Sequence, residues 1–342
     1  YTSNMQKIDR NLLIAWDKHI KKSKILIIGD IMLDVYIQGQ VHRISPEAPV
    51  PIVNITDTKT CLGGAANVAF NIQAMGATPI LCGIIGNDIK GREFIQTIEA
   101  HNMPTQGIVT IDNRQTTTKT RVIGNKVQLL RIDEETDQIL SLEDSEKLYE
   151  HIKNLLLKEE INAIIFEDYD KGVITPLLID RITQLAIEKS IPITVDPKKR
   201  NFLNYKNVTI FKPNLSELKN GLDIDKNDVD IESLNNKIKQ FKKENQIDIV
   251  MTTMSDKGIM IAYNKKSEHT YDWIPAHFRS IADVSGAGDT VISIATLALI
   301  YGFSPTLIAE LSNIAGGLVC ESIGVVPIDK SRFFEECLSI LG

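Results

Sequence analysis

The amino-acid sequence predicts an α/β protein built on a doubly wound, mostly parallel sheet, with a small second β-sheet. Short runs rich in Ile and Val, such as KILIIGD and IDIVMTT, each end in polar or turn residues, as strands buried on both faces do. Helical patterns separate these runs, and such strand–helix alternation is typical of a doubly wound sheet. The 342 residues are enough for one large domain or two ordinary ones.

Composition narrows the class of protein. The chain is 43% hydrophobic and 24% charged with a formal net charge of −6, which argues against a nucleic-acid-binding protein. Its four cysteines are scattered without a paired spacing, as in an intracellular protein with free thiols. No run reaches the roughly 18 apolar residues of a membrane span, and the start lacks a signal-peptide core. We therefore expect a cytoplasmic protein that binds no membrane.

Local signals predict where several helices begin. An apolar residue recurs every four positions from Ile8 to Ile20, which predicts a short amphipathic helix. Ser141 and the acid three residues later resemble a capping box. Thr175–Pro176 and Ser304–Pro305 each place proline at the first helical position.

Two segments interrupt the strand–helix alternation. Residues 35–60 alternate in polarity and carry three prolines, and residues 116–133 indicate two strands around a turn at Gly124–Asn125. Together they predict a small separate β-sheet inserted into the α/β domain. We find no linker, repeat or low-complexity tract, which favours one domain over residues 1–342.

Polar residues at strand ends are the first candidates for a site, because ligands of open α/β sheets bind outside the carboxyl ends of the strands. Asp30 and Asp34 follow the first predicted strand and could accept hydrogen bonds from sugar hydroxyls; turn chemistry with a helix N-cap is the alternative. Gly63 and Gly64 precede a predicted helix, and Asn67 in its first turn could point into the same crevice. A tight bend would also explain the two glycines.

Two later strand ends carry further candidates. In KPNLSE, Asn214 and Glu217 share one face of a predicted helix start and could order a magnesium ion through water, or simply cap the helix. In TTMSDKG, Thr253, Ser255 and Gly258 form a hydroxyl-rich turn compatible with phosphate contacts.

The stretch DVSGAGDTVIS is the strongest candidate. Gly286, Ala287 and Gly288 lead into a helix predicted from about Thr290, and the unpaired N–H groups of a helix start favour an anion. Asp289 beside such an anion could accept the proton of an attacking hydroxyl. The alternatives are a tight bend and an N-cap role for the aspartate. No G-x-x-x-x-G-K-[ST] is present, so a P-loop kinase is excluded.

With these motifs in this order, the chain resembles the ribokinase-like (PfkB) family of carbohydrate kinases. GGAANVAFNIQAMGATPILCGIIG is similar to the family's amino-terminal signature and DVSGAGDTVIS to its carboxy-terminal one, and the resemblance extends from about Lys24 to Asp329. The family usually has a small residue five places after the aspartate; here that residue is Ile294, which we interpret as a packing variation.

One branch of the family matches particularly well. GDIMLDVYIQGQVHRISPEAPVPIVNI, TTTKTRVIGNKVQLLRIDEE, EDYDKG and KPNLSE resemble kinases of D-glycero-β-D-manno-heptose 7-phosphate, which serve lipopolysaccharide precursor synthesis. The resemblance implies ATP-dependent phosphorylation of the C1 hydroxyl to give the 1,7-bisphosphate. Alternatives are a ribokinase-like kinase for fructose, ribose or a nucleoside, and a non-catalytic sugar- or nucleotide-binding regulator.

The resemblance also implies roles for individual residues, with ATP and Mg²⁺ as cofactors. Asp289 would be the catalytic base, with the backbone of Gly286, Ala287 and Gly288 as the anion hole. The sugar would be held by Asp30, Asp34, Gly63, Gly64 and Asn67. The nucleotide phosphates and the magnesium ion would lie against Asn214, Leu215, Ser216 and Glu217, and the rest of the nucleotide near Thr253, Ser255 and Gly258. Candidate cations for the substrate's phosphate are Arg43, Arg121, Arg131 and Lys171.

The two inserts would form a β lid, which in this family often makes a homodimer contact. Two-domain synthases of this branch carry a nucleotidyltransferase domain with an H-x-G-H signature, which this sequence lacks. We therefore expect a stand-alone kinase or the kinase part of a longer protein.

Overall fold

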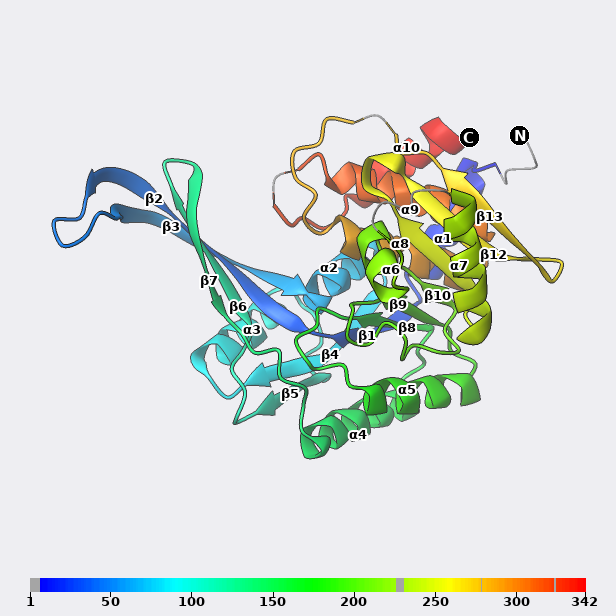
Figure 1. Ribbon diagram of the computed structural model, residues 1–342, viewed down its shortest axis with the longest axis horizontal. Coiled ribbons are helices and arrows are strands. Elements are labelled where there is room, and N and C mark those ends of the chain that lie inside the picture. The colour runs from blue at the N-terminus through cyan, green and yellow to red at the C-terminus, as the bar shows by residue number, and fades with distance from the viewer. Residues whose placement is uncertain (1–6, 226–230, 278, 323) are drawn as a thin grey trace.

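The computed structural model describes residues 7–225, 231–277, 279–322 and 324–342. Within these residues, nine strands form the main sheet (Figure 1). Their order across the sheet is β13 (Glu268–Ile274), β12 (Ile259–Lys265), β11 (Ile249–Thr253), β10 (Ile210–Phe211), β9 (Ile193–Asp196), β8 (Ala163–Glu167), β1 (Lys24–Gly29), β4 (Thr78–Gly86) and β5 (Ile108–Ile111). The strands from β11 to β5 are parallel, and β12 and β13 add an antiparallel hairpin at one edge. The predicted fold class is confirmed.

Helices cover both faces of this sheet, and β1 shows why. Ile25 and Ile27 belong to one core, whereas Leu26 and Ile28 belong to the other, so the strand is apolar on both sides. The first core packs against α1 (Arg10–Ile20), α2 (Ala65–Met75), α3 (Ile89–Ala100), α8 (Ala287–Tyr301), α9 (Pro305–Val319) and α10 (Lys330–Leu341). The second packs against α4 (Leu142–Lys158), α5 (Pro176–Glu188), α6 (Leu215–Gly221) and α7 (Ile231–Glu244).

The predicted helix starts are confirmed where the cap is local. The hydroxyls of Ser141, Thr175 and Ser304 accept hydrogen bonds from the N–H groups of the first turns of α4, α5 and α9. The start of α8 was predicted at about Thr290 but lies at Ala287. Ala287 and Gly288, which we predicted to lie in the turn before the helix, therefore belong to its first turn.

The two inserts form one four-stranded sheet, the lid, as predicted. Its order is β3 (Pro51–Gly64), β2 (Ile31–Ile44), β6 (Thr118–Gly124) and β7 (Val127–Glu134). Its long hairpin of β2 and β3 projects away from the main sheet (Figure 1). The strands exceed the predicted 35–60 at both ends. Asn125 and Lys126 adopt positive φ values of 51° and 67°, so the tight turn lies one residue later than predicted.

Among the helices that the structure describes, none combines the length and the apolar character needed to cross a bilayer.

Candidate active site

A cleft of about 1210 Å³ lies beside the carboxyl ends of β9, β10 and β11. Three segments that are far apart in the sequence line it: Asn214–Glu217, Thr253–Gly258 and Gly286–Asp289. The structure therefore brings the predicted nucleotide-binding residues and the predicted catalytic turn into one cavity. This is the place that a doubly wound sheet offers a ligand.

The turn at Gly286 opens helix α8 toward this cleft. Gly286 is the N-cap residue with φ 78°, a left-handed conformation that favours glycine, and no side chain caps the helix start. A Cβ atom there would lie 2.9 Å from the amide nitrogen of Asn67, so the position also has little room. The N–H groups of an uncapped helix start and the helix dipole together attract an anion.

Asp289 lies in the first turn of α8 and is only 6% exposed. It does not cap the helix; instead its two carboxylate oxygens accept hydrogen bonds from Asn67 Nδ2 at 2.5 Å and the Tyr169 hydroxyl at 2.8 Å. Burial raises the pKa of Asp289 to about 6, even though these two hydrogen bonds lower it. A carboxylate with a pKa this close to neutral can take a proton from a hydroxyl group and release it again.

Asp196 and Lys212 form a buried ion pair at the floor of the cleft, with Asp196 Oδ2 and Lys212 Nζ 2.7 Å apart. Burial alone would lower the pKa of Lys212, but Asp196 and other nearby acids raise it. Lys198, whose ammonium contacts Glu217, adds a second cation. None of the three was predicted from the sequence, although Asp196 ends β9 and Lys212 directly follows β10. The position of Asp196 and Lys212 at the ends of strands is a signal that the sequence carries.

Glu167, Asp196 and Asp289 bring three buried carboxylates together, with one oxygen of each within 4.8 Å of the others. Both oxygens of Glu167 and Oδ1 of Asp196 lack a hydrogen-bond partner among the described residues. Burial, together with the charges of Asp196 and Asp289, raises the pKa of Glu167 well above its usual value. Carboxylate oxygens without a hydrogen bond in such a group fit a hard divalent cation such as Mg²⁺.

The predicted magnesium residues have local partners in the structure. Asn214 Oδ1 accepts from the Glu217 N–H, and Glu217 Oε2 accepts from the Asn214 N–H, both at 2.8 Å. This is a complete capping box for α6, so the helix-cap alternative accounts for their spacing. A water-mediated magnesium role for the two residues stays a prediction.

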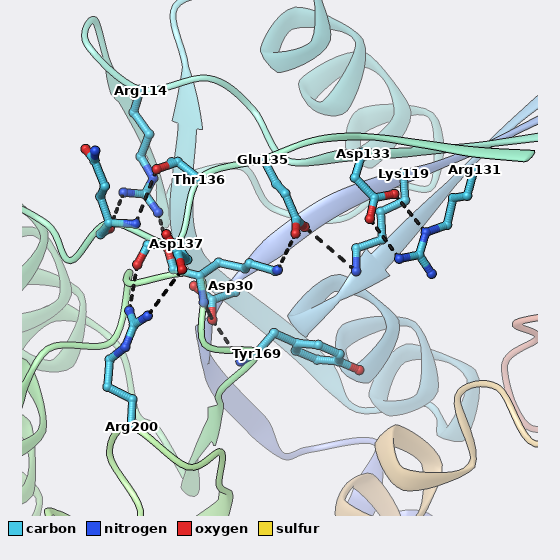
Figure 2. Close-up of polar contacts among 12 residues, drawn as sticks. Asp30, Arg114, Lys119, Arg131, Asp133, Glu135, Thr136, Asp137, Tyr169 and Arg200 are labelled. Atoms are coloured by element: carbon cyan, nitrogen blue, oxygen red, sulfur yellow. Dashed lines mark hydrogen bonds and ion pairs between the residues drawn. The ribbon is translucent and has the colours of Figure 1, made fainter.

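Asp30 holds the loop after β8 rather than facing the cleft. Its carboxylate accepts hydrogen bonds from the N–H groups of Tyr169, Lys171 and Val173 at 2.8, 3.1 and 3.2 Å. Figure 2 shows the bond between Asp30 and Tyr169. These bonds fix the loop that carries the Tyr169 hydroxyl to Asp289. A direct contact between Asp30 and a sugar stays a prediction, and Tyr169 is a site residue that the sequence analysis missed.

Asp34 lies in β2 beside the two glycines that precede α2. Its Oδ1 is 2.5 Å from an Arg121 guanidinium nitrogen, and a Cβ atom on Gly63 would lie 2.3 Å from its Oδ2. Gly64 has a φ of 61° and leads directly into α2, where Asn67 contacts Asp289. The predicted sugar residues are thus close together: Gly63 lies against Asp34, Gly64 leads into α2, and Asn67 of α2 contacts the candidate base Asp289.

The four candidate cations for a substrate phosphate lie in different places. Arg43 is nine residues beyond Asp34 in the extended strand β2, roughly 30 Å along the lid at about 3.3 Å per residue. The structure does not bring it to the site within one chain. Arg131 forms two 2.8 Å bonds with Asp133 (Figure 2), and Arg121 pairs with Asp34. Lys171 pairs with Glu135 at 2.6 Å.

Ile294, the position at which the second signature departs from the family pattern, is fully buried in α8 and belongs to the first core. The interpretation as a packing variation agrees with this position.

Comparison with known proteins identifies relatives that match most of the chain. The family model for pfkB family carbohydrate kinases matches residues 22–331. Bifunctional protein HldE of Wolinella succinogenes is 35% identical over 300 residues, which are 88% of this chain and 61% of that protein. Bifunctional protein HldE of Methylobacillus flagellatus is 36% identical over 315 residues, 92% of this chain and 63% of that protein. The chain spans less than two thirds of the length of these relatives.

Solved structures share the fold at much lower identity. Phosphofructokinase-2 from Escherichia coli in complex with potassium superposes with a TM-score of 0.75 at 16% identity, covering 93% of this chain and 99% of that one. Ribokinase of Arabidopsis thaliana, complexed with ribose and ATP, gives a TM-score of 0.68 at 15% identity with the same coverage. These likenesses show that the fold is ribokinase-like.

Proposed function

The chain belongs to the pfkB family of carbohydrate kinases, and from this premise we propose that it phosphorylates the C1 hydroxyl of D-glycero-β-D-manno-heptose 7-phosphate. Its family makes it an ATP-dependent sugar kinase. The choice of sugar is supported by the segments that resemble heptose 7-phosphate kinases. It is further supported by the similarity to bifunctional proteins named HldE. The product would be the 1,7-bisphosphate, a precursor for lipopolysaccharide synthesis.

The observation that carries the kinase mechanism is the position of Asp289. It is buried in the cleft, in the first turn of the uncapped helix α8, with a pKa raised to about 6 by burial. A sugar hydroxyl that replaces Tyr169 or Asn67 as its hydrogen-bond donor would pass its proton to Asp289 as it attacks the phosphoryl group. The N–H groups at Gly286–Gly288 would stabilise the charge on that group.

The remaining groups of the cleft would hold the nucleotide. Lys198 and Lys212 supply positive charge near its phosphates, and the turn at Thr253–Gly258 lines the same cavity. Glu167 and Asp196 would hold a magnesium ion, with Asp289 next to them. When bound, that ion would neutralise phosphate charge.

We also propose that the protein is cytoplasmic and that it forms a homodimer through the lid. Apolar side chains are exposed on one face of the lid, where Leu130 is 50% and Ile132 47% exposed. In a dimer the lid would close over the sugar and exclude water, which competes as a phosphoryl acceptor.

Release of ADP tests the proposed function directly. With ATP and Mg²⁺ we compare D-glycero-D-manno-heptose 7-phosphate with ribose, fructose, fructose 6-phosphate and adenosine, and we expect strong turnover only with the heptose phosphate. EDTA should abolish turnover and added Mg²⁺ should restore it. Turnover of another sugar would change the proposed substrate but would still show a sugar kinase. Nucleotide binding without turnover of any sugar would favour a non-catalytic regulator.

A further inference from the structure

Glu135 lies between two lysines beside the proposed sugar site. Its Oε1 is 2.6 Å from Lys171 Nζ, and its Oε2 is 3.8 Å from Lys119 Nζ (Figure 2). The side chain of Glu135 is 25% exposed, that of Lys171 16% and that of Lys119 20%. Glu135 Oε2 has no hydrogen-bond partner among the described residues. The Glu135 carboxylate thus lies between two ammonium groups, and it is within hydrogen-bond distance of Lys171 only.

These three residues come from segments that frame the sugar. Lys119 is in lid strand β6, directly in register with Asp34 of β2, so the two side chains share a face of the lid. Lys171 is in the loop that Asp30 holds, two residues after Tyr169, whose hydroxyl reaches Asp289. Glu135 directly follows β7. The lysine pair therefore lies where the lid meets the loop of the candidate base.

Two arginines of this face each have a carboxylate of their own. Arg121 contacts Asp34, and Arg131 makes a two-point contact with Asp133. Lys119 and Lys171 share a single carboxylate, so together they carry one positive charge more than their partner. A phosphate monoester, with a charge of about −1.5 to −2 at neutral pH, matches such a pair better than a carboxylate does.

We propose that Lys119 and Lys171 form the subsite for the phosphate group of a phosphorylated sugar, and that Glu135 occupies this subsite until the substrate displaces it. This inference rests on the proposed function, because it requires a sugar that already carries a phosphate. Only a substrate with an anionic group can compete with Glu135 for the lysines. The glutamate therefore selects against unphosphorylated sugars of similar shape.

The test measures KM for the heptose 7-phosphate and for ATP in four variants and two controls. The double variant Lys119→Met/Lys171→Met should raise KM for the sugar phosphate at least about tenfold, the loss expected for charge-assisted hydrogen bonds, with KM for ATP unchanged. Lys119→Arg/Lys171→Arg keeps both positive charges and should return KM for the sugar phosphate close to the wild-type value. This result would show that the methionine variant fails through lost charge and not through misfolding. Glu135→Gln should lower KM for the sugar phosphate several-fold, and Lys119→Met alone should show the smaller part of the double effect.

The matched controls are Lys153→Met and Glu150→Gln, which break an ion pair of 3.1 Å in α4 and should change neither constant. An unchanged KM for the sugar phosphate in the double methionine variant would overturn the proposed subsite, but it would not affect the proposed kinase activity. A raised KM in Glu135→Gln would show that the glutamate orders the site instead of occupying it, and would overturn its role as occupant.

A binding experiment separates failure of the subsite from failure of the proposed function. Inorganic phosphate is titrated calorimetrically into protein saturated with ADP, so that the nucleotide cleft is filled. Binding that weakens in the double methionine variant and strengthens in Glu135→Gln supports the subsite even if the heptose phosphate is not turned over. Identical phosphate binding in all variants would overturn it whatever the substrate.

Discussion

At the scale of single residues, the chemistry of this site depends on burial more than on contact with cations. Asp289 receives hydrogen bonds from Asn67 and Tyr169, yet burial still raises its pKa to about 6. An exposed aspartate would have a pKa near 3.9 and would be a much weaker base. The same burial strengthens the Asp196–Lys212 ion pair in the cleft.

Replacing Asp289 by asparagine should separate binding from chemistry. Asparagine keeps the shape of the side chain but cannot accept the hydroxyl proton, so we expect turnover to fall by at least roughly a hundredfold. ATP affinity, measured by calorimetry, should stay largely intact. The exposed Asp180 of α5 provides the matched control, Asp180→Asn, which should retain full activity. Near-normal turnover in Asp289→Asn would remove the residue from the role of base.

The sequence predicted some site residues and missed others for a physical reason. Asp289 and Asn67 stand beside glycine-rich turns, and Asp34 follows the first predicted strand, and both signals are visible locally. Tyr169 reaches the site only because Asp30 folds its loop through three backbone hydrogen bonds. Lys119 depends on its register with Asp34 across the lid. Contacts of the second kind arise from pairing between distant segments, which a single sequence does not record.

At the scale of elements, Asp88 links a helix to the start of the lid strand β6. It is the N-cap of α3, accepting from the Gly91 N–H at 2.6 Å, and it also accepts from the N–H and the hydroxyl of Thr116, both at 2.8 Å. Burial alone would raise the pKa of Asp88, but these hydrogen bonds lower it below its ordinary value. One carboxylate thus fixes both α3 and the entry to the second insert.

Replacing Asp88 by alanine should therefore destabilise the protein by about 1–3 kcal/mol at pH 7, the cost of a lost cap and of unpaired donors. Because the folded state lowers its pKa, Asp88 stabilises the protein above the unfolded pKa of roughly 3.9, and this stabilisation is lost as the pH falls through the folded value. Urea unfolding at pH 7 and at pH 3 checks both statements. A difference between wild type and variant that is as large at pH 3 as at pH 7 would contradict the charge-dependent part.

Element boundaries follow the same division between local and distant causes. Thr175–Pro176 and Ser304–Pro305 start α5 and α9 at the predicted residues, because a cap and a proline act within one turn. The lid strands run past the predicted 35–60, because their length is set by pairing between β2 and β3, which continues from Ile31 with Gly64 to Ile44 with Pro51.

At the scale of the whole molecule, the lid has two unlike faces. Asp34, Lys119 and Asp133 are in register across β2, β6 and β7 and form a charged face. The opposite face carries Leu130 and Ile132, which alternate with Arg131 along β7 and stay about half exposed. The charged face serves the sugar site in our proposal, which leaves the apolar face for a partner.

We predict that this apolar face is the dimer contact, and that Leu130→Glu/Ile132→Glu gives a monomer at micromolar concentrations where the wild type sediments as a dimer. Two buried glutamates without partners would cost far more than the apolar contact contributes. The control is Leu157→Glu in α4, which is not part of the lid; this leucine is 61% exposed, and its replacement should leave the dimer intact. Sedimentation equilibrium distinguishes the states. A wild-type monomer, or a dimer that survives the double substitution, would show that the lid works within one chain, and Arg43 at its far end would then have no site to serve.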